Sequence, residues 1–166
     1  VKDSSASESR RQAYVAVRAQ RPDLVLLDGD EFNCVAYIRD GYDGLLLGGG
    51  IFNARLAARI IAAVKAGDLA GAEKLQARMN DLMLRVYGGP KIECWMSGLK
   101  ELLVQMGVFA RRDNFLGYPL TDTCRDQIAA AVSGADGLGY REDLLGTQPA
   151  QKQAEEPKFA VLSRGY

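Results

Sequence analysis

The chain has 166 residues, and its 21 lysines and arginines balance its 21 aspartates and glutamates, so the formal net charge is zero. This balance argues against a protein that binds nucleic acid or an anionic membrane through bulk charge, and no apolar run approaches the roughly 20 residues that span a bilayer. The sequence contains no histidine, which excludes a Ser-His-Asp triad, a Cys-His pair and a His-ligated metal site within it.

The first third of the sequence alternates between helical and strand patterns. Short continuous apolar runs bounded by Asp, Pro and Gly are typical of strands that are buried on both faces of a parallel sheet. Alternation of this kind with short connections predicts an α/β fold with right-handed crossovers for residues 1–66. In chain order, the pattern predicts a helix over 8–20, a strand over 24–27, a helix over 31–40, a strand over 44–47 and a helix over 52–66.

The character of the chain changes after Gly67, because residues 67–132 contain no strand pattern. Apolar residues fall on one helical face over 69–86 and again over 92–106, and Thr121 or Asp122 is placed to cap a further helix through Val132. This segment is therefore predicted to be helical, with an extended link at 116–120 before the last helix. Glycines and prolines interrupt residues 133–166, which are predicted to be an extended or disordered tail.

The three cysteines, Cys34, Cys94 and Cys124, are too scattered for a disulfide framework and lack the paired spacing of a zinc site. All three lie in helical patterns, where a cysteine is typical of a small core residue in a reducing compartment. We expect no metal site, and we expect the protein to be cytoplasmic.

Two strands of the buried type cannot close a parallel sheet by themselves, because each needs a neighbour on its other edge. Nothing after residue 67 supplies such strands. We therefore expect the sheet to be completed by a partner chain or by upstream sequence.

Lys2 stands at the end of what would be a third strand, and the other two strands also end in polar, glycine-rich turns. In a barrel these strand ends share the face on which active sites are built. A lysine turned into a barrel would lose water that stabilises its ammonium form, and its free amine could attack a ketone to form an iminium, an electron sink. The alternative is a solvated terminal lysine, which these residues alone favour because lysine is usually exposed.

The segment Lys2-Asp3-Ser4-Ser5 resembles the Schiff-base lysine motif of the dihydrodipicolinate synthase / N-acetylneuraminate lyase family, the pyruvate-dependent class I aldolases. Further landmarks follow in the family's order. They are a strand-seven turn at 26–31, a strand-eight segment at 41–48, the Gly-Asp junction of the helical region at 63–72, and closing helices with a Pro-Leu link at 91–107 and 118–120.

This resemblance implies strands six to eight of a (β/α)8 TIM barrel, followed by a three-helix C-terminal region. It implies a Schiff-base-forming lyase, an aldolase or a dehydratase, that acts on pyruvate or a 2-oxo sugar acid without a cofactor. It also implies a homo-oligomer. The family's strand-two hydroxyl pair and strand-five tyrosine would lie in an N-terminal barrel half that is missing from this sequence.

The resemblance assigns the catalytic amine to Lys2 and substrate binding to Gly29, Asp30, Glu31 and Leu46. Gly29 would let backbone approach the keto acid, and Leu46 would line the pyruvate methyl group. Asp30 and Glu31 would bind substrate hydroxyls, which favours a sugar acid. Each has a structural alternative. Gly29 could be a simple turn glycine, and Leu46 could be barrel core. Asp30 could cap the helix that follows and Glu31 could be a carboxylate in its first turn, which is the role we favour for Glu31.

Two other functions remain open on the sequence. Gly48-Gly49-Gly50 precedes a predicted helix, whose amides could bind phosphate, although the run lacks the Gly-Lys-Ser/Thr ending of a nucleotide loop. We favour close packing of the turn as the reason for these glycines. The chain could also be a non-catalytic truncated fragment that acts as an assembly or binding module.

Overall fold

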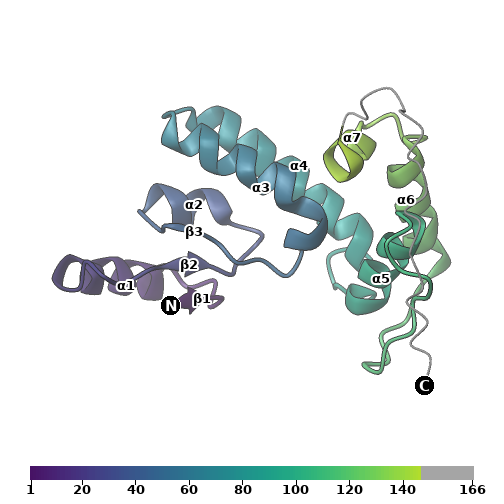
Figure 1. The fold of residues 1–166 in the computed structure, drawn as a ribbon, viewed down its shortest axis with the longest axis horizontal. Helices are drawn as coiled ribbons and strands as arrows, with labels where there is room; N and C mark the ends of the chain where they lie inside the picture. The colour runs from purple at the N-terminus through teal and green to yellow at the C-terminus, as the bar shows by residue number, and fades with distance from the viewer. Residues whose placement is uncertain (147–166) are drawn as a thin grey trace, which may run out of the picture.

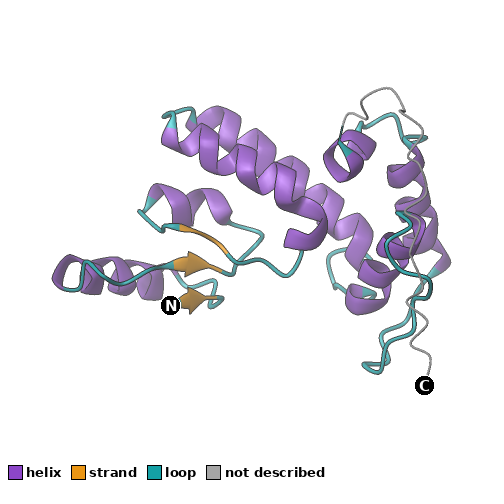
Figure 2. Cartoon of the chain, in the orientation of Figure 1, coloured by secondary structure: helices purple, strands orange, loops and turns teal. Residues whose placement is uncertain are grey.

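The computed structural model of the protein describes residues 1–146, which form three short strands and seven helices. The strands lie together near the N-terminus, and helices make up most of the remaining chain (Figures 1 and 2). In chain order the elements are β1 (Lys2–Asp3), α1 (Glu8–Gln20), β2 (Leu27–Asp28), α2 (Cys34–Arg39), β3 (Gly44–Leu45), α3 (Gly50–Lys65), α4 (Leu69–Tyr87), α5 (Trp95–Gln105), α6 (Asp122–Ser133) and α7 (Tyr140–Leu145).

The strands form one parallel sheet in the order β1-β2-β3, as the α/β alternation predicts. Lys2 is paired with Leu27, and Leu27 is paired with Gly44. The paired segments are shorter than the apolar runs, but backbone hydrogen bonds continue on both sides of β2, from Asp43 N to Leu26 O at 2.9 Å and from Gly29 N to Asp3 O at 2.7 Å.

The two faces of this sheet have different surroundings, because successive side chains of a strand point to opposite faces. Leu26 and Asp28 are fully buried beneath the helices, and Leu45 packs against the main core. Lys2 and Leu46 alternate with these positions and are exposed. The sheet therefore has a face covered by helices and a face that the described residues leave open.

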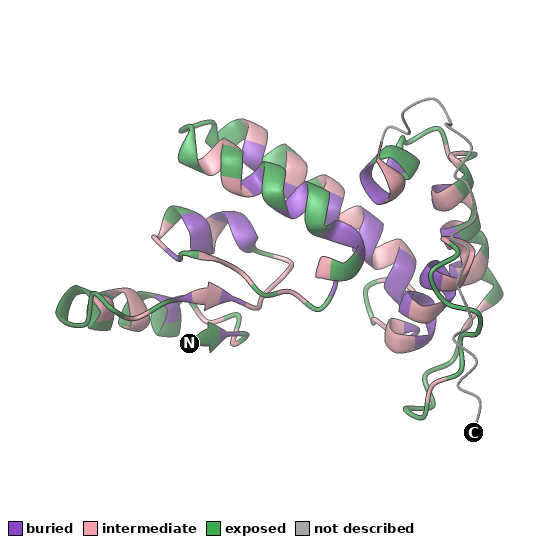
Figure 3. Ribbon diagram, viewed as in Figure 1, coloured by how far each residue is buried: buried purple, intermediate pink, exposed green. Residues whose placement is uncertain are grey.

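One hydrophobic core joins the sheet to the helical region. It runs along the facing sides of α3 and α4 and continues into α5, α6 and α7 (Figure 3). Leu26, Tyr37 and Tyr42 form a smaller cluster between the sheet, α1 and α2. The three cysteines are free and buried, as predicted. Within residues 1–146, no helix combines the length and apolar character needed to cross a bilayer.

Local sequence signals fix several helix ends where they were predicted. The helix over 8–20 is confirmed, and the Ser7 hydroxyl accepts a hydrogen bond from Arg10 N at 3.4 Å. Thr121 caps α6 by accepting from Cys124 N at 3.2 Å. By contrast, α2 begins at Cys34 and not at Glu31, since the residues before it form a turn.

The structure differs from the prediction in part of the segment 133–166, because Tyr140–Leu145 is the helix α7. Its first residue, Tyr140, is 4% exposed, with the guanidinium groups of Arg78 and Arg85 over its ring at 4.6 and 5.6 Å. The short helix is therefore ordered by contacts with α4 that are distant in sequence. The rest of the predicted tail, residues 147–166, lies outside the described residues.

Gly98 in α5 is where the helical region packs most closely, and its replacement by alanine should destabilise the fold. A Cβ at this position would lie 1.8 Å from the backbone oxygen of Val86 in α4, which is itself fully buried. We expect Gly98→Ala to lower the free energy of unfolding by about 1–3 kcal/mol or more, measured by urea denaturation.

The control is Gly50→Ala in α3, where the nearest atom to the added Cβ would be 3.8 Å away. This variant should lose no stability, because the contact is an ordinary one and alanine favours the helix. Equal losses in the two variants would show that the α4–α5 contact is not the tight one.

Candidate active site

The open face of the sheet carries the lysine and one of the turns that the sequence places at the site. Gly29 directly follows β2, and a Cβ on Gly29 would lie 2.5 Å from Lys2 Cε and 2.1 Å from Ser4 Oγ. A side chain at this position would therefore push Lys2 and Ser4 out of their present places over the turn. The exposed lysine and the glycine turn are therefore in contact, at the carboxyl ends of adjacent parallel strands.

Leu46 and Asp30 lie at the same end of the sheet. Leu46 follows β3 and is 51% exposed, and its backbone N–H donates to Asp28 O at 2.7 Å. Asp30 follows Gly29 in the turn, and burial raises the pKa of its carboxyl. Four of the five predicted site residues, Lys2, Gly29, Asp30 and Leu46, thus come from the ends of the three neighbouring strands.

Glu31, the fifth, is held by the protein itself. Its Oε2 accepts a hydrogen bond from Gly49 N at 2.5 Å, and its Oε1 accepts one from the hydroxyl of Tyr87 at 2.9 Å. The structural alternative for Glu31, a carboxylate in the first turn of the helix over 31–40, is wrong, because α2 begins at Cys34 and the carboxylate instead meets the turn before α3. The N-cap of α2 is Asn33, so Asp30 does not have the capping role considered for it.

The same contact bears on phosphate binding by the run Gly48-Gly49-Gly50. The amide of Gly49, at the N-terminus of α3, already donates to a carboxylate. Glu31 thus stands where an anion would bind and interacts favourably with the positive end of the helix dipole. The glycines instead allow close approach, since a Cβ on Gly49 would lie 2.8 Å from the Tyr87 hydroxyl.

Two acids lie behind the lysine, on the face covered by helices. Asp3 accepts hydrogen bonds from Ser5 N and from the Tyr42 hydroxyl, both at 3.0 Å. Burial opposes ionisation of Asp3, but these hydrogen bonds prevail and lower its pKa. Sequence reasoning singled out neither acid, because Asp3 is read only as part of the lysine motif and Asp28 as a turn residue that ends the strand over 24–27.

Asp28 is the less satisfied of the two acids. Its Oδ1 accepts from Asp30 N at 2.6 Å, whereas its Oδ2 has no hydrogen-bond partner among the described residues. Burial, assisted by the negative charges of Asp30 and Asp3, raises the pKa of Asp28 to about 7. Burial and the nearby Asp28 also raise the pKa of the Cys34 thiol, which keeps that cysteine protonated.

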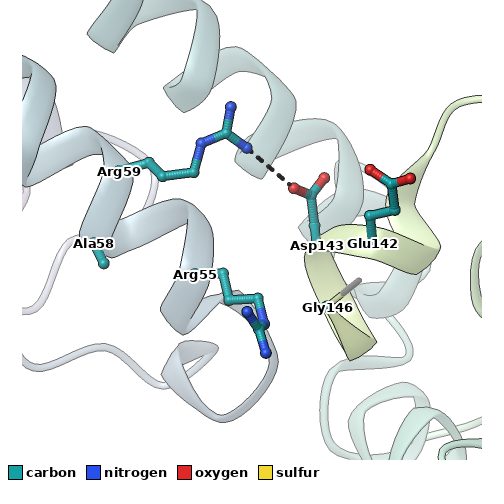
Figure 4. A pocket seen from close by; sticks show the side chains of 6 residues that line it. All are labelled: Arg55, Ala58, Arg59, Glu142, Asp143 and Gly146. Atoms are coloured by element: carbon teal, nitrogen blue, oxygen red, sulfur yellow. Dashed lines mark hydrogen bonds and ion pairs between the residues drawn. The ribbon is translucent and has the colours of Figure 1, made fainter. Parts of the chain in front are cut away.

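A hollow lies between α3 and α7, away from the sheet and from the candidate site (Figure 4). Arg59 and Arg78 both pair with the buried carboxylate of Asp143, at 3.4 and 2.5 Å. Arg59 and Asp143, which both line the hollow, thus neutralise each other. Among the described residues, no group of three or more His, Cys, Asp or Glu side chains is arranged to hold a metal ion.

The sequence profile of the dihydrodipicolinate synthetase family matches residues 1–134. The chain belongs to this family. Its members are TIM-barrel proteins, and the three-stranded parallel sheet is a part of such a barrel. No curated protein matches the sequence.

Solved structures of this family share the fold of the chain. Dihydrodipicolinate synthase from Bacteroides thetaiotaomicron is 23% identical with a TM-score of 0.68, over 80% of this chain and 45% of that one. N-acetylneuraminate lyase from Fusobacterium nucleatum is 19% identical with a TM-score of 0.66, over 81% of this chain and 44% of that one. The lyase from Mycoplasma synoviae is 19% identical with a TM-score of 0.63, over 80% and 43%. This chain therefore spans less than half the length of these relatives.

The raised pKa of Asp28 predicts a pH dependence of stability. The folded protein holds this proton more tightly than the unfolded chain, whose aspartates titrate near 3.8. The contribution of Asp28 is therefore most favourable below about pH 4 and is lost as the pH rises towards 7. Asp28→Asn should remove this loss, so that at pH 8 the variant is more stable than the wild type by up to about 4 kcal/mol.

The measurement is the difference in unfolding free energy between variant and wild type from pH 4 to pH 8. Gln127→Asn in α6 provides the control, since neither side chain titrates and the difference should be flat across this range. A flat difference for Asp28→Asn as well would contradict the raised pKa.

Proposed function

We propose that this chain carries the Schiff-base lysine of a pyruvate-dependent lyase, an aldolase or a dehydratase, and that Lys2 is the nucleophile. The observation that carries the proposal is the contact between the Lys2 side chain and the bare Cα of Gly29, on the open face at the carboxyl ends of the strands. Family membership supports a lyase or condensation reaction of this class.

In the proposed reaction, the amine of Lys2 attacks the ketone carbon of a 2-oxo acid to give a carbinolamine. Loss of water gives an iminium, which withdraws electrons from the neighbouring carbon. Loss of a proton from that carbon, or cleavage of its bond to the rest of a larger substrate, gives an enamine. The enamine can add to an aldehyde or take up a proton, and hydrolysis then frees the lysine. The iminium acts as the electron sink, so the proposal requires no cofactor.

The surrounding residues would position the keto acid. Backbone at Gly29 can approach the substrate because no side chain intervenes, and the exposed Leu46 would contact the methyl group of pyruvate. Asp30 would accept hydrogen bonds from substrate hydroxyls. The substrate would be pyruvate or a 2-oxo acid built on it, such as a 2-keto-3-deoxy sugar acid, or the reaction would be a condensation like that of dihydrodipicolinate synthase.

This proposal assigns β1, β2 and β3 to barrel strands six, seven and eight. The outer edges of β1 and β3 have no strand partner within residues 1–146. An N-terminal barrel half would pair with both edges, cover the open face and bury Lys2. Assembly of complete barrels into a homo-oligomer is part of the same proposal.

Borohydride trapping tests the role of Lys2. With the barrel complete, incubation with pyruvate and then borohydride should attach the reduced adduct to the peptide that carries Lys2. Lys2→Arg should abolish trapping, because arginine keeps the charge and cannot form an imine. Lys65→Arg in α3 is the matched control and should trap like the wild type. An adduct on another lysine would remove Lys2 from the mechanism.

The 166-residue chain by itself should trap poorly, because its Lys2 is exposed and no complete barrel surrounds it to position the keto acid. Efficient trapping by this chain would show that the site needs no further residues. If the complete barrel also fails to trap, the non-catalytic assembly or binding module becomes the better proposal.

Gly29→Ala tests the contact between the turn and the lysine. The added Cβ would displace the ends of the Lys2 and Ser4 side chains, which are exposed and can move, so we expect little change in stability. Trapping should fall at least tenfold, because misplacement of a reacting group by about 1 Å is costly. Gly48→Ala is the control, since its Cβ would meet only the Glu31 carboxylate, at 3.9 Å, and should leave the trapping yield unchanged.

A further inference from the structure

Three segments that are far apart in sequence meet at the carboxylate of Glu31. Glu31 lies in the turn after β2, Gly49 in the turn after β3, and Tyr87 is the last residue of α4. Both oxygens of the carboxylate are used, one by the Gly49 amide at 2.5 Å and one by the Tyr87 hydroxyl at 2.9 Å. The helical region thus reaches the carboxylate of Glu31 through the Tyr87 phenol, while Gln76 and Asn80 of α4 hold the backbone of the same turn by donating to Glu31 O and Phe32 O, each at 3.1 Å.

The phenol is firmly held. Tyr87 is 1% exposed, and its ring packs edge-on against Phe52 of α3, with centroids 6.0 Å apart and planes at 87°. Directly after it, Gly88 adopts φ +81° and ends α4, and a Cβ there would lie 2.6 Å from Cys94 Sγ. Neither the ring nor its backbone can shift without disturbing the core.

The charges favour this arrangement. Burial and the negative charge of Glu31 raise the pKa of Tyr87, so the phenol stays protonated and donates throughout the neutral range. The carboxylate accepts two hydrogen bonds and lies at the N-terminus of α3, where a negative charge is stabilised. If Glu31 turned towards a substrate, it would leave the buried Tyr87 hydroxyl without a partner.

We propose that Tyr87 is a positioning residue that keeps Glu31 away from the substrate, so that the site favours a short 2-oxo acid over a polyhydroxylated one. This inference rests on the proposed function. The sequence argument for a sugar acid relied on the polarity of Asp30 and Glu31 together. Since Glu31 serves the protein's own structure, only Asp30 of that pair remains for substrate hydroxyls.

The test replaces only the hydroxyl that holds Glu31. In the protein with its barrel complete, half-saturating concentrations for borohydride trapping are measured with pyruvate and with 2-keto-3-deoxygluconate. Tyr87→Phe should leave the value for pyruvate within about twofold and lower that for 2-keto-3-deoxygluconate by roughly two- to tenfold, the worth of one hydrogen bond. Adding Glu31→Gln to Tyr87→Phe should reduce this fall in the half-saturating concentration of 2-keto-3-deoxygluconate, because the fall comes from the freed carboxylate.

The matched control is Tyr140→Phe, which removes the hydroxyl of another buried tyrosine, one that donates to Asp81 away from the sheet. Its ratio of the two half-saturating concentrations should equal that of the wild type. A ratio in Tyr87→Phe equal to that of the wild type would overturn the proposal, whether both half-saturating concentrations stay the same or both change by the same factor. If Tyr87→Phe fails to fold, Glu31→Gln alone tests the proposal. A higher half-saturating concentration for 2-keto-3-deoxygluconate but not for pyruvate would make Glu31 a substrate contact and overturn the proposal, whereas an unchanged ratio would support it.

A second measurement does not depend on the proposed reaction. Hydrogen exchange of the Gly49 amide in the 166-residue chain should be roughly two- to tenfold faster in Tyr87→Phe, because the Glu31 carboxylate loses one of the two hydrogen bonds that hold it. Tyr140→Phe should leave this rate unchanged. Unchanged exchange in Tyr87→Phe would refute the positioning role even if Lys2 traps, whereas faster exchange without trapping at Lys2 would refute the proposed reaction alone.

Discussion

The arrangement of the candidate site depends on the backbone hydrogen bonds that β2 makes to strands on both of its sides. These bonds set the register in which Lys2 is opposite Leu27 and Asp3 is opposite Asp28. A slip of one residue would turn every side chain of a strand to the other face. The register therefore decides that the lysine faces the open side of the sheet and that Asp3 faces the helices.

The covered face shows what this register requires. It brings two carboxylates, Asp3 and Asp28, beneath the helices, where an acid needs hydrogen-bond donors. Asp3 has them in Ser5 and Tyr42, and it stays ionised. Among the described residues Asp28 has only the Asp30 amide as a hydrogen-bond donor, and burial raises its pKa to about 7. The register that exposes Lys2 thus also places a poorly satisfied acid, Asp28, on the covered face of the neighbouring strand.

Local chemistry made the first half of the fold predictable. The helix over 8–20 has a serine cap and an apolar face, and the strands over 24–27 and 44–47 show as apolar runs between turn residues. The family motif then singled out the lysine and the glycine of the β2 turn, and the structure brings these two residues together. These features depend on residues close together in the chain, where periodicity and turn preferences act directly.

The partners of Glu31 could not be predicted in this way. Tyr87 is 56 positions away in the helical region, and in sequence it reads as one more apolar residue of an amphipathic helix. Helix α7 was missed for the same reason, because Tyr140 is ordered by Arg78 and Arg85 and not by its neighbours. Contacts that span the chain carry no local pattern.

The location of Tyr87 on α4 has a consequence for how such a site can diverge. Phe52, Gly88 and Cys94, which fix the position of the phenol, do not belong to the turns that surround Lys2. Substitutions in this packing layer would alter the orientation of Glu31 while every residue beside the lysine stays the same. Two descendants of one ancestor could therefore have identical reaction centres and still differ in the acids that they accept.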